Sequence, residues 1–115
     1  MGAINVGDLS GPWVVARWAF QGYLDHVLTE VSKDPPLTYA VEEALALDGL
    51  HLPLTDAAVV RRLAPILLRV ANEVVSGARP VRVEGRNLDD DSQEQFRQAV
   101  AELRTMLARV EAPGG

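Results

Sequence analysis

The sequence predicts a mainly α-helical single domain, arranged as an irregular or up-down four-helix bundle with two short extended connectors. Apolar residues recur with a helical period of about 3.6 residues in four stretches, which prolines and glycines separate. The chain has 115 residues, of which 48% are apolar and 23% charged, as in soluble globular domains. It contains no cysteine, so its core forms without disulfides or thiolate-bound metals.

The first helix is predicted to begin at a Ser10 N-cap, with Pro12 in its first turn. It should end at Ser32 or Lys33, because the two prolines that follow cannot continue it. Its core-facing stripe consists of Trp13, Phe20, Leu24, Val27, Leu28 and Val31. The domain spans residues 1–115, and we expect flexible ends at residues 1–10 and 112–115.

The second helix is predicted to start at Leu37 or Thr38 and to stop before Gly49, which is expected to terminate it. The segment LHLPL, residues 50–54, alternates leucine with other residues and is therefore predicted to be extended. A second extended segment is predicted at residues 79–88. Pairing of these two connectors would give a minimal two-stranded ribbon.

Thr55 and Asp56 are predicted to cap the third helix, which should reach Ser76 before Gly77 stops it. Pro65 lies inside this helix and is expected either to bend it or to split it in two. The fourth helix opens in the acidic run DDDSQEQ, where Asp91 is the expected cap. Its apolar face is regular over about five turns and consists of Phe96, Ala99, Val100, Leu103, Met106, Leu107 and Val110.

The sequence carries no local signature of catalysis, metal binding or cofactor binding. The aspartates at positions 89–91 lack the glycine and glutamate that a calcium loop needs at its sixth and twelfth positions. The two histidines, His26 and His51, are not at a metal-binding spacing, and no phosphate-binding glycine motif is present. We therefore predict no catalytic residue, metal or cofactor, and lean toward a protein that is not an enzyme.

Charge is distributed unevenly along this acidic chain, whose net charge is -5. Residues 1–56 carry two basic and eight acidic side chains, whereas residues 57–88 carry six arginines and two glutamates. Arg61, Arg62 and Arg69 share the polar side of the third helix, where guanidinium groups could hold an acidic partner surface. The competing interpretation is that the folded surface mixes the two blocks and the arginines only keep the protein soluble.

Net charge and hydrophobicity also limit where the protein is expected to act and which partners it is expected to bind. The acidic net charge argues against nucleic-acid binding, which depends on bases that neutralise phosphates. No apolar stretch is long enough to cross a membrane. The first residues do not resemble a secretory signal, so a cytoplasmic location is expected.

A second apolar patch lies opposite the main stripe of the first helix. It consists of Val15, Trp18, Ala19 and Gly22, so the first half of this helix is apolar nearly all round. Such a helix needs cover on both sides. The cover could come from the chain itself, from a second copy of the chain or from another protein.

The leading hypothesis is a non-enzymatic helical protein-interaction module of the adaptor, regulator or inhibitor type. It would bind through this apolar patch and the three arginines, and form a homodimer through the first helix. The alternative is a small-molecule-binding protein or enzyme with a pocket between helices. In that case Trp13 or Trp18 would form the walls together with Tyr23, and Arg17 or His26 would be the polar anchor.

Overall fold

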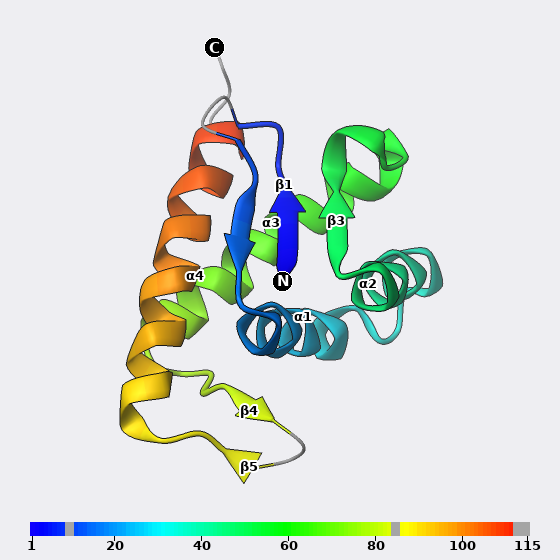
Figure 1. Ribbon diagram of the computed structural model, residues 1–115. Coiled ribbons are helices and arrows are strands. Elements are labelled where there is room, and N and C mark those ends of the chain that lie inside the picture. Colours follow the sequence, from blue (N-terminus) through cyan, green and yellow to red (C-terminus); the bar gives the residue numbers. More distant parts are fainter. Residues whose placement is uncertain (9–10, 84–85, 112–115) are drawn as a thin grey trace.

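The structure, a computed structural model, describes residues 1–8, 11–83 and 86–111 (Figure 1). Its four helices are α1 (Arg17–Val31), α2 (Pro35–Leu47), α3 (Ala57–Val75) and α4 (Asp90–Glu111). A three-stranded sheet in the order β2-β1-β3 is formed by β1 (Gly2–Asn5), β2 (Trp13–Val15) and β3 (Gly49–His51). A 3-10 turn, η1 (Leu52–Leu54), follows β3, and β4 (Arg82–Val83) pairs with β5 (Arg86–Asn87) in a separate hairpin. The prediction of a mainly α fold with short extended parts is confirmed.

The helices enclose the small sheet on several sides. Figure 1 shows α3 crossing behind the sheet, α4 running along one side of it, and α1 with α2 lying across its lower end. The β4–β5 hairpin projects below α1, away from the sheet. Apolar side chains from all four helices and from β1 form one buried cluster in the centre.

The amino-terminal segment corrects the expectation of a flexible end at residues 1–10. Its strand β1 is the middle strand of the sheet, where Ile4 lies opposite Trp13 of β2 and Leu50 of β3. Ile4 is fully buried, and a side chain at Gly2 would overlap the ring of Phe20. The segment is held by partners far away in sequence, which a local pattern does not reveal. Residues 9, 10 and 112–115 lie outside the described residues.

Strand β2 also corrects the predicted start of the first helix. The helix begins at Arg17 instead of near Pro12, because Trp13, Val14 and Val15 pair with β1 in antiparallel register. Val14 and Val15 are β-branched and suit a strand better than a helix. Trp13 is nevertheless in the core, as predicted, and its Nε1 donates to the carbonyl oxygen of Ala99 on α4 (2.8 Å).

At three helix ends, the start and end of α2 and the start of α4, an aspartate takes a position predicted for another residue. At α2, Asp34 accepts from the backbone N–H of Leu37, so the helix starts at Pro35, earlier than predicted. Prolines are tolerated there because the first helical N–H groups have no partner inside the helix. Asp48, with φ of 53°, takes the left-handed position expected of Gly49. At α4, Asp89 accepts from Ser92 N (2.8 Å) in place of the predicted Asp91.

The third helix matches its prediction closely. Asp56 accepts from the backbone N–H groups of Ala58 and Val59, and Gly77 has a left-handed φ of +88° after the C-cap Ser76. Pro65 lies on the exposed side of a continuous helix, so it does not split α3 in two.

The two predicted connectors do not pair with each other, so that part of the ribbon prediction is wrong. Only the first two residues of the first connector are extended: they belong to β3, which pairs in parallel with β1, whereas Leu52–Leu54 form the 3-10 turn η1. The second connector folds back on itself as the β4–β5 hairpin. The strand β1, absent from the prediction, supplies the partner that β3 needed. Residues 84 and 85 of the second connector are outside the described residues.

Candidate functional site

The apolar patch predicted on the first helix is covered by the chain itself. Ala19 is buried, and a Cβ on Gly22 would lie only 2.6 Å from Val81 Cγ2. Trp18 is half-buried, with its ring centroid 6.5 Å from that of Phe96 on α4. Val15 is half-buried and packs against the core. The prediction that this patch is a partner-binding surface is therefore corrected for Ala19 and Gly22, because no partner can reach them in the folded chain.

A single glutamine holds the cover in place. Val81 N donates to Gln93 Oε1 (2.7 Å), and Gln93 Nε2 donates to the Val81 carbonyl oxygen (2.9 Å). This pair of bonds ties the segment before β4 to the first turns of α4. Because Gly22 has no side chain, Val81 can then approach α1 closely.

The residues of the alternative pocket lie in different surroundings, and the pocket itself stays a prediction. Trp13 and Tyr23 pack edge to face in the core, with centroids 5.9 Å apart, and Tyr23 donates to the Leu67 carbonyl oxygen (2.6 Å). Burial raises the pKa of the Tyr23 hydroxyl well above its usual range. Arg17 instead pairs with Asp48 (3.2 Å) at the surface, and His26 Nε2 donates to the Pro80 carbonyl oxygen (2.8 Å).

The predicted arginine surface is partly occupied by acidic residues of the same chain. Arg62 pairs with Asp34, and Arg69 pairs with Glu30 (2.9 Å). Arg61 is exposed. The basic block of the sequence thus folds against the acidic block, in agreement with the mixed-surface interpretation. Exposed pairs of this kind contribute about 0–1 kcal/mol each to stability.

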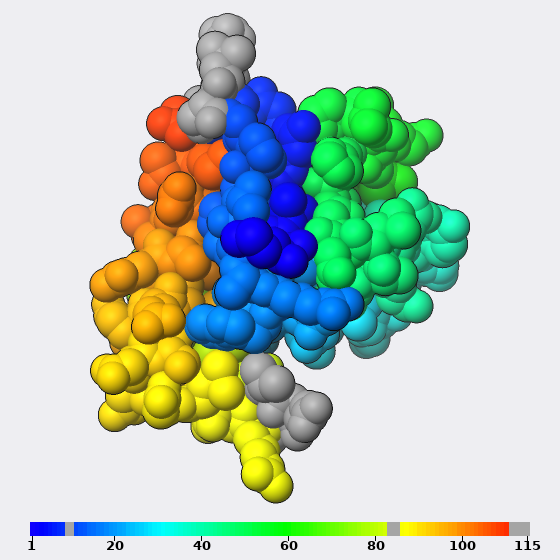
Figure 2. Space-filling model, viewed as in Figure 1, coloured from blue at the N-terminus to red at the C-terminus, as the bar shows by residue number. Residues whose placement is uncertain are grey.

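A groove that the sequence analysis missed lies between α2, β3, η1 and the start of α3. Its volume is about 440 Å³, and it is lined by Pro36, Tyr39, Ala40, Glu43, Ala44, Leu47, Gly49, Leu50, His51, Leu54, Thr55, Asp56 and Val59. In Figure 2 these segments, coloured from cyan to green, lie together on the right-hand part of the visible face. The lining comes from these four elements and from the Thr55–Asp56 loop, all within one stretch of 24 residues, from Pro36 to Val59.

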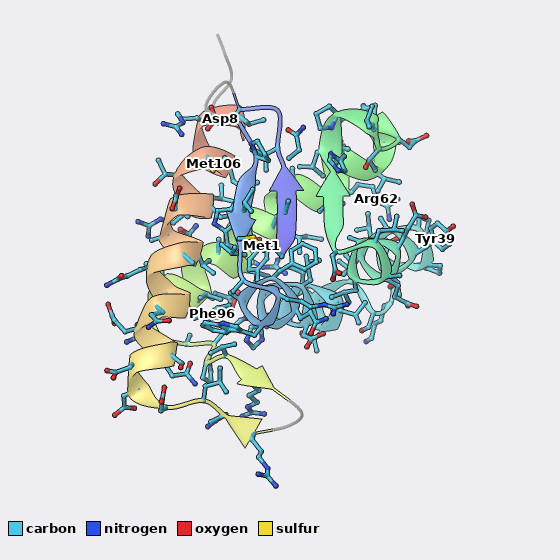
Figure 3. All side chains as sticks on the ribbon, in the orientation of Figure 1. Met1, Asp8, Tyr39, Arg62, Phe96 and Met106 are labelled. Atoms are coloured by element: carbon cyan, nitrogen blue, oxygen red, sulfur yellow. The ribbon has the colours of Figure 1, made fainter. Side chains whose placement is uncertain are left out.

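The groove gathers large apolar side chains that the fold leaves in water. Six such side chains are exposed among the described residues, and three of them line it: Leu54 at 86%, Leu47 at 70% and Tyr39 at 70%. Figure 3 shows Tyr39 on α2 at the outer edge of the molecule. Single exposed apolar residues are ordinary, but several in one concave site indicate a binding surface.

The groove is also acidic. Its lining contains the carboxylates of Glu43 and Asp56 but no lysine or arginine. The Tyr39 hydroxyl is hydrogen-bonded to Glu43, and this bond together with the negative charge raises the pKa of Tyr39. Asp56 caps α3 through the backbone N–H groups of Ala58 and Val59, and its carboxylate lines the groove. The site favours a ligand that is apolar and positively charged.

One signal for the groove was present in the sequence. Leu47 lies four residues after Glu43, on the polar side of the second helix and away from its apolar stripe. A leucine at such a position is expected to be exposed and not buried in the core. Leu54 ends the LHLPL segment, where the alternating pattern predicts burial, but η1 turns its side chain into water.

Neither a candidate metal cluster nor a candidate membrane-spanning helix is found among the described residues. Within them, no three His, Asp or Glu side chains come together in an arrangement that could hold a metal ion. None of their helices combines the length and apolar character needed to cross a membrane. Comparison with known proteins gives no match, whether to a protein-family model, to a curated protein or to a solved structure.

Proposed function

We propose that this protein is a non-enzymatic interaction module that binds a segment of another protein in the groove between α2 and β3. The observation that carries the proposal is the collection of Tyr39, Leu47 and Leu54, all largely exposed, in one concave site. Tyrosine is among the residue types that contribute most at protein interfaces, and apolar anchors in pockets supply much of the binding energy. The proposed role is that of a small adaptor or regulator, acting in the cytoplasm.

The preferred partner segment combines apolar side chains with lysine or arginine. The apolar groups would cover the two leucines, while the basic groups would face Glu43 and Asp56. Complementary charge of this kind speeds association and selects the correct partner more than it adds raw affinity. This proposal differs from self-association through α1, because the apolar patch of α1 is already covered by Val81 and Phe96.

A selection of random peptides displayed on phage tests the proposal directly. Peptides enriched on the folded protein should carry basic residues beside apolar ones. Their affinity, measured by fluorescence anisotropy, should fall about tenfold in Leu47→Ser and in Leu54→Ser, as expected when an interface anchor is lost. Val110→Ser is the matched control, because Val110 is also exposed near the end of a helix but lies outside the groove.

Charge is tested by a second pair of variants. Glu43→Lys should weaken binding of the basic peptides, whereas Glu102→Lys, an exposed position on α4, should leave it unchanged. The proposal is contradicted if no peptide is enriched, or if enriched peptides bind Leu47→Ser and Leu54→Ser as tightly as the original protein. A dimer in light scattering that Leu54→Ser dissociates would assign the groove to a second copy of the chain instead.

A further inference from the structure

Among the described residues, the strand β3 that lines the groove pairs with another strand on one edge only. The sheet order β2-β1-β3 places β3 at the edge, and all three residues of β3 line the groove. Natural edge strands are often protected by lysine, proline or a bulge, because unpaired backbone groups invite pairing with another chain. β3 has only three residues, Gly49, Leu50 and His51, with no lysine or proline among them, and the first proline after it is Pro53 in η1.

Two hydrogen bonds show which backbone groups of β3 face the groove. The Asp48 carbonyl oxygen accepts from Ala3 N (3.2 Å) of β1, so it points into the sheet. The His51 carbonyl oxygen accepts from the Thr55 hydroxyl (2.8 Å), so it points away from β1. Backbone groups of successive residues in a strand point to opposite edges. The N–H and C=O of Gly49 and the N–H of His51 therefore face the groove, and Thr55 occupies the last acceptor.

The walls of the groove suit an extended segment along this edge. Tyr39 and Leu47 lie on the α2 side, and Leu54 follows β3 on η1. Leu50 is buried in the core, and Gly49 before it carries no side chain. A segment in β conformation presents alternate side chains to opposite sides, so apolar and basic residues could alternate between the leucines and the carboxylates.

We infer that the partner segment binds as an additional strand on β3, through backbone bonds to Gly49 and His51, with alternating apolar and basic side chains. This inference rests on the proposed function of the groove. Strand addition of this kind takes affinity from main-chain hydrogen bonds and specificity from the pockets that receive alternate side chains. It distinguishes the partner from an amphipathic helix, which would use the same apolar walls without the backbone of β3.

Two synthetic peptides with the same length and leucine–lysine composition test this inference. One alternates leucine with lysine, as a strand requires, and the other arranges them with the period of a helix. The alternating peptide should bind more tightly. A backbone N-methyl group should reduce its affinity about tenfold at the one residue whose N–H bonds to the Gly49 carbonyl oxygen, because only that methyl group removes a hydrogen bond to β3.

Amide hydrogen exchange, followed by NMR, gives the second readout. The alternating peptide should slow exchange of the His51 amide and leave that of Leu50, which faces β1, unchanged. Tighter binding of the helical peptide, or binding of the alternating peptide without slower exchange at His51, overturns strand addition. If neither peptide binds, the inference is overturned as well, while the phage selection and the Leu47→Ser variant decide the proposed function separately.

Discussion

The apolar patch on α1 and the groove beside α2 both carry apolar side chains, but the chain covers the first and leaves the second exposed. On α1, the patch of Trp18, Ala19 and Gly22 is covered by Val81 and Phe96. In the groove, no described residue covers Leu47 or Leu54, which are 70% and 86% exposed. The comparison teaches that an apolar surface on one helix or strand does not by itself show whether that surface is buried. Its burial depends on segments that are distant in the sequence.

The α1 patch is covered because small side chains there let another segment of the chain come close. Gly22 allows another part of the chain to approach, and Gln93 holds Val81 there through two hydrogen bonds. Leu47 and Leu54 instead flank β3 at the rim of the groove. Removing apolar area from water stabilises by roughly 25 cal/mol per Å². The groove thus retains free energy that a partner can gain on binding.

The largest expected loss of stability follows from removing a side chain that covers the α1 patch. Phe96→Ala should lower the free energy of unfolding by about 3–5 kcal/mol, the usual range for removing a fully buried phenylalanine. Urea denaturation measures this change, with Val110→Ala on the same helix as the exposed control. A loss below about 1 kcal/mol would mean that Phe96 is not an essential part of the cover over Trp18.

The next effect tests the close approach at Gly22. Replacing glycine by alanine inside a helix normally stabilises by roughly 0.5–1 kcal/mol, but here the new Cβ would meet Val81. Gly22→Ala should therefore destabilise by about 1–3 kcal/mol, as overpacking does. In a Val81→Ala background the same substitution should become neutral or stabilising. If Gly22→Ala stabilises the original protein, Val81 is free to move and the cover is loose.

A smaller effect concerns the core beneath the same patch. Tyr23→Phe should cost about 1 kcal/mol by removing the hydrogen bond to Leu67. Because burial raises the pKa of Tyr23, its contribution is fully present below about pH 10, the pKa of an unfolded tyrosine, and declines as pH rises above that value. Urea midpoints measured from neutral to alkaline pH should fall less steeply for Tyr23→Phe. Equal slopes for the two proteins would contradict the buried position of this hydroxyl.

The smallest expected change in stability is for a substitution in the groove. Leu54→Ser should change the free energy of unfolding by less than about 0.5 kcal/mol, because a largely exposed side chain loses little on truncation. The same variant is expected to lose peptide binding, so stability and binding separate at this position. A loss of several kcal/mol in thermal or urea unfolding would show that Leu54 is covered in solution.

Regular amphipathic helices were the part of the fold that the sequence predicted well. The boundaries of α3 follow from the helical period and from local caps such as Asp56, and so does the apolar face of α4, except that its last predicted residue, Val110, is exposed. The strands β1 and β2 were missed because they are short and depend on pairing between distant residues. Trp13 was placed in the core on the correct grounds of apolarity, although it lies on a strand and not on a helix.

The candidate site was harder to predict than the fold. The patch on α1 was recognised as apolar, but its cover by Val81 depends on a connector whose path no local pattern fixes. The groove depends on exposure, and a leucine in a sequence gives no measure of its own exposure. Leu47, displaced from its helix stripe toward Glu43, was the one position where helical periodicity could have indicated the groove.

The most direct test of the account uses the absence of cysteine from the chain. Single variants Leu47→Cys, in the groove, and Ala19→Cys, on the α1 patch, are reacted with a maleimide with and without a phage-selected peptide. We predict that Leu47→Cys reacts at nearly the rate of a free thiol and is protected by the peptide, while Ala19→Cys stays unreactive in the folded protein. Rapid labelling of Ala19→Cys that the peptide slows, with Leu47→Cys unaffected by it, would contradict the account.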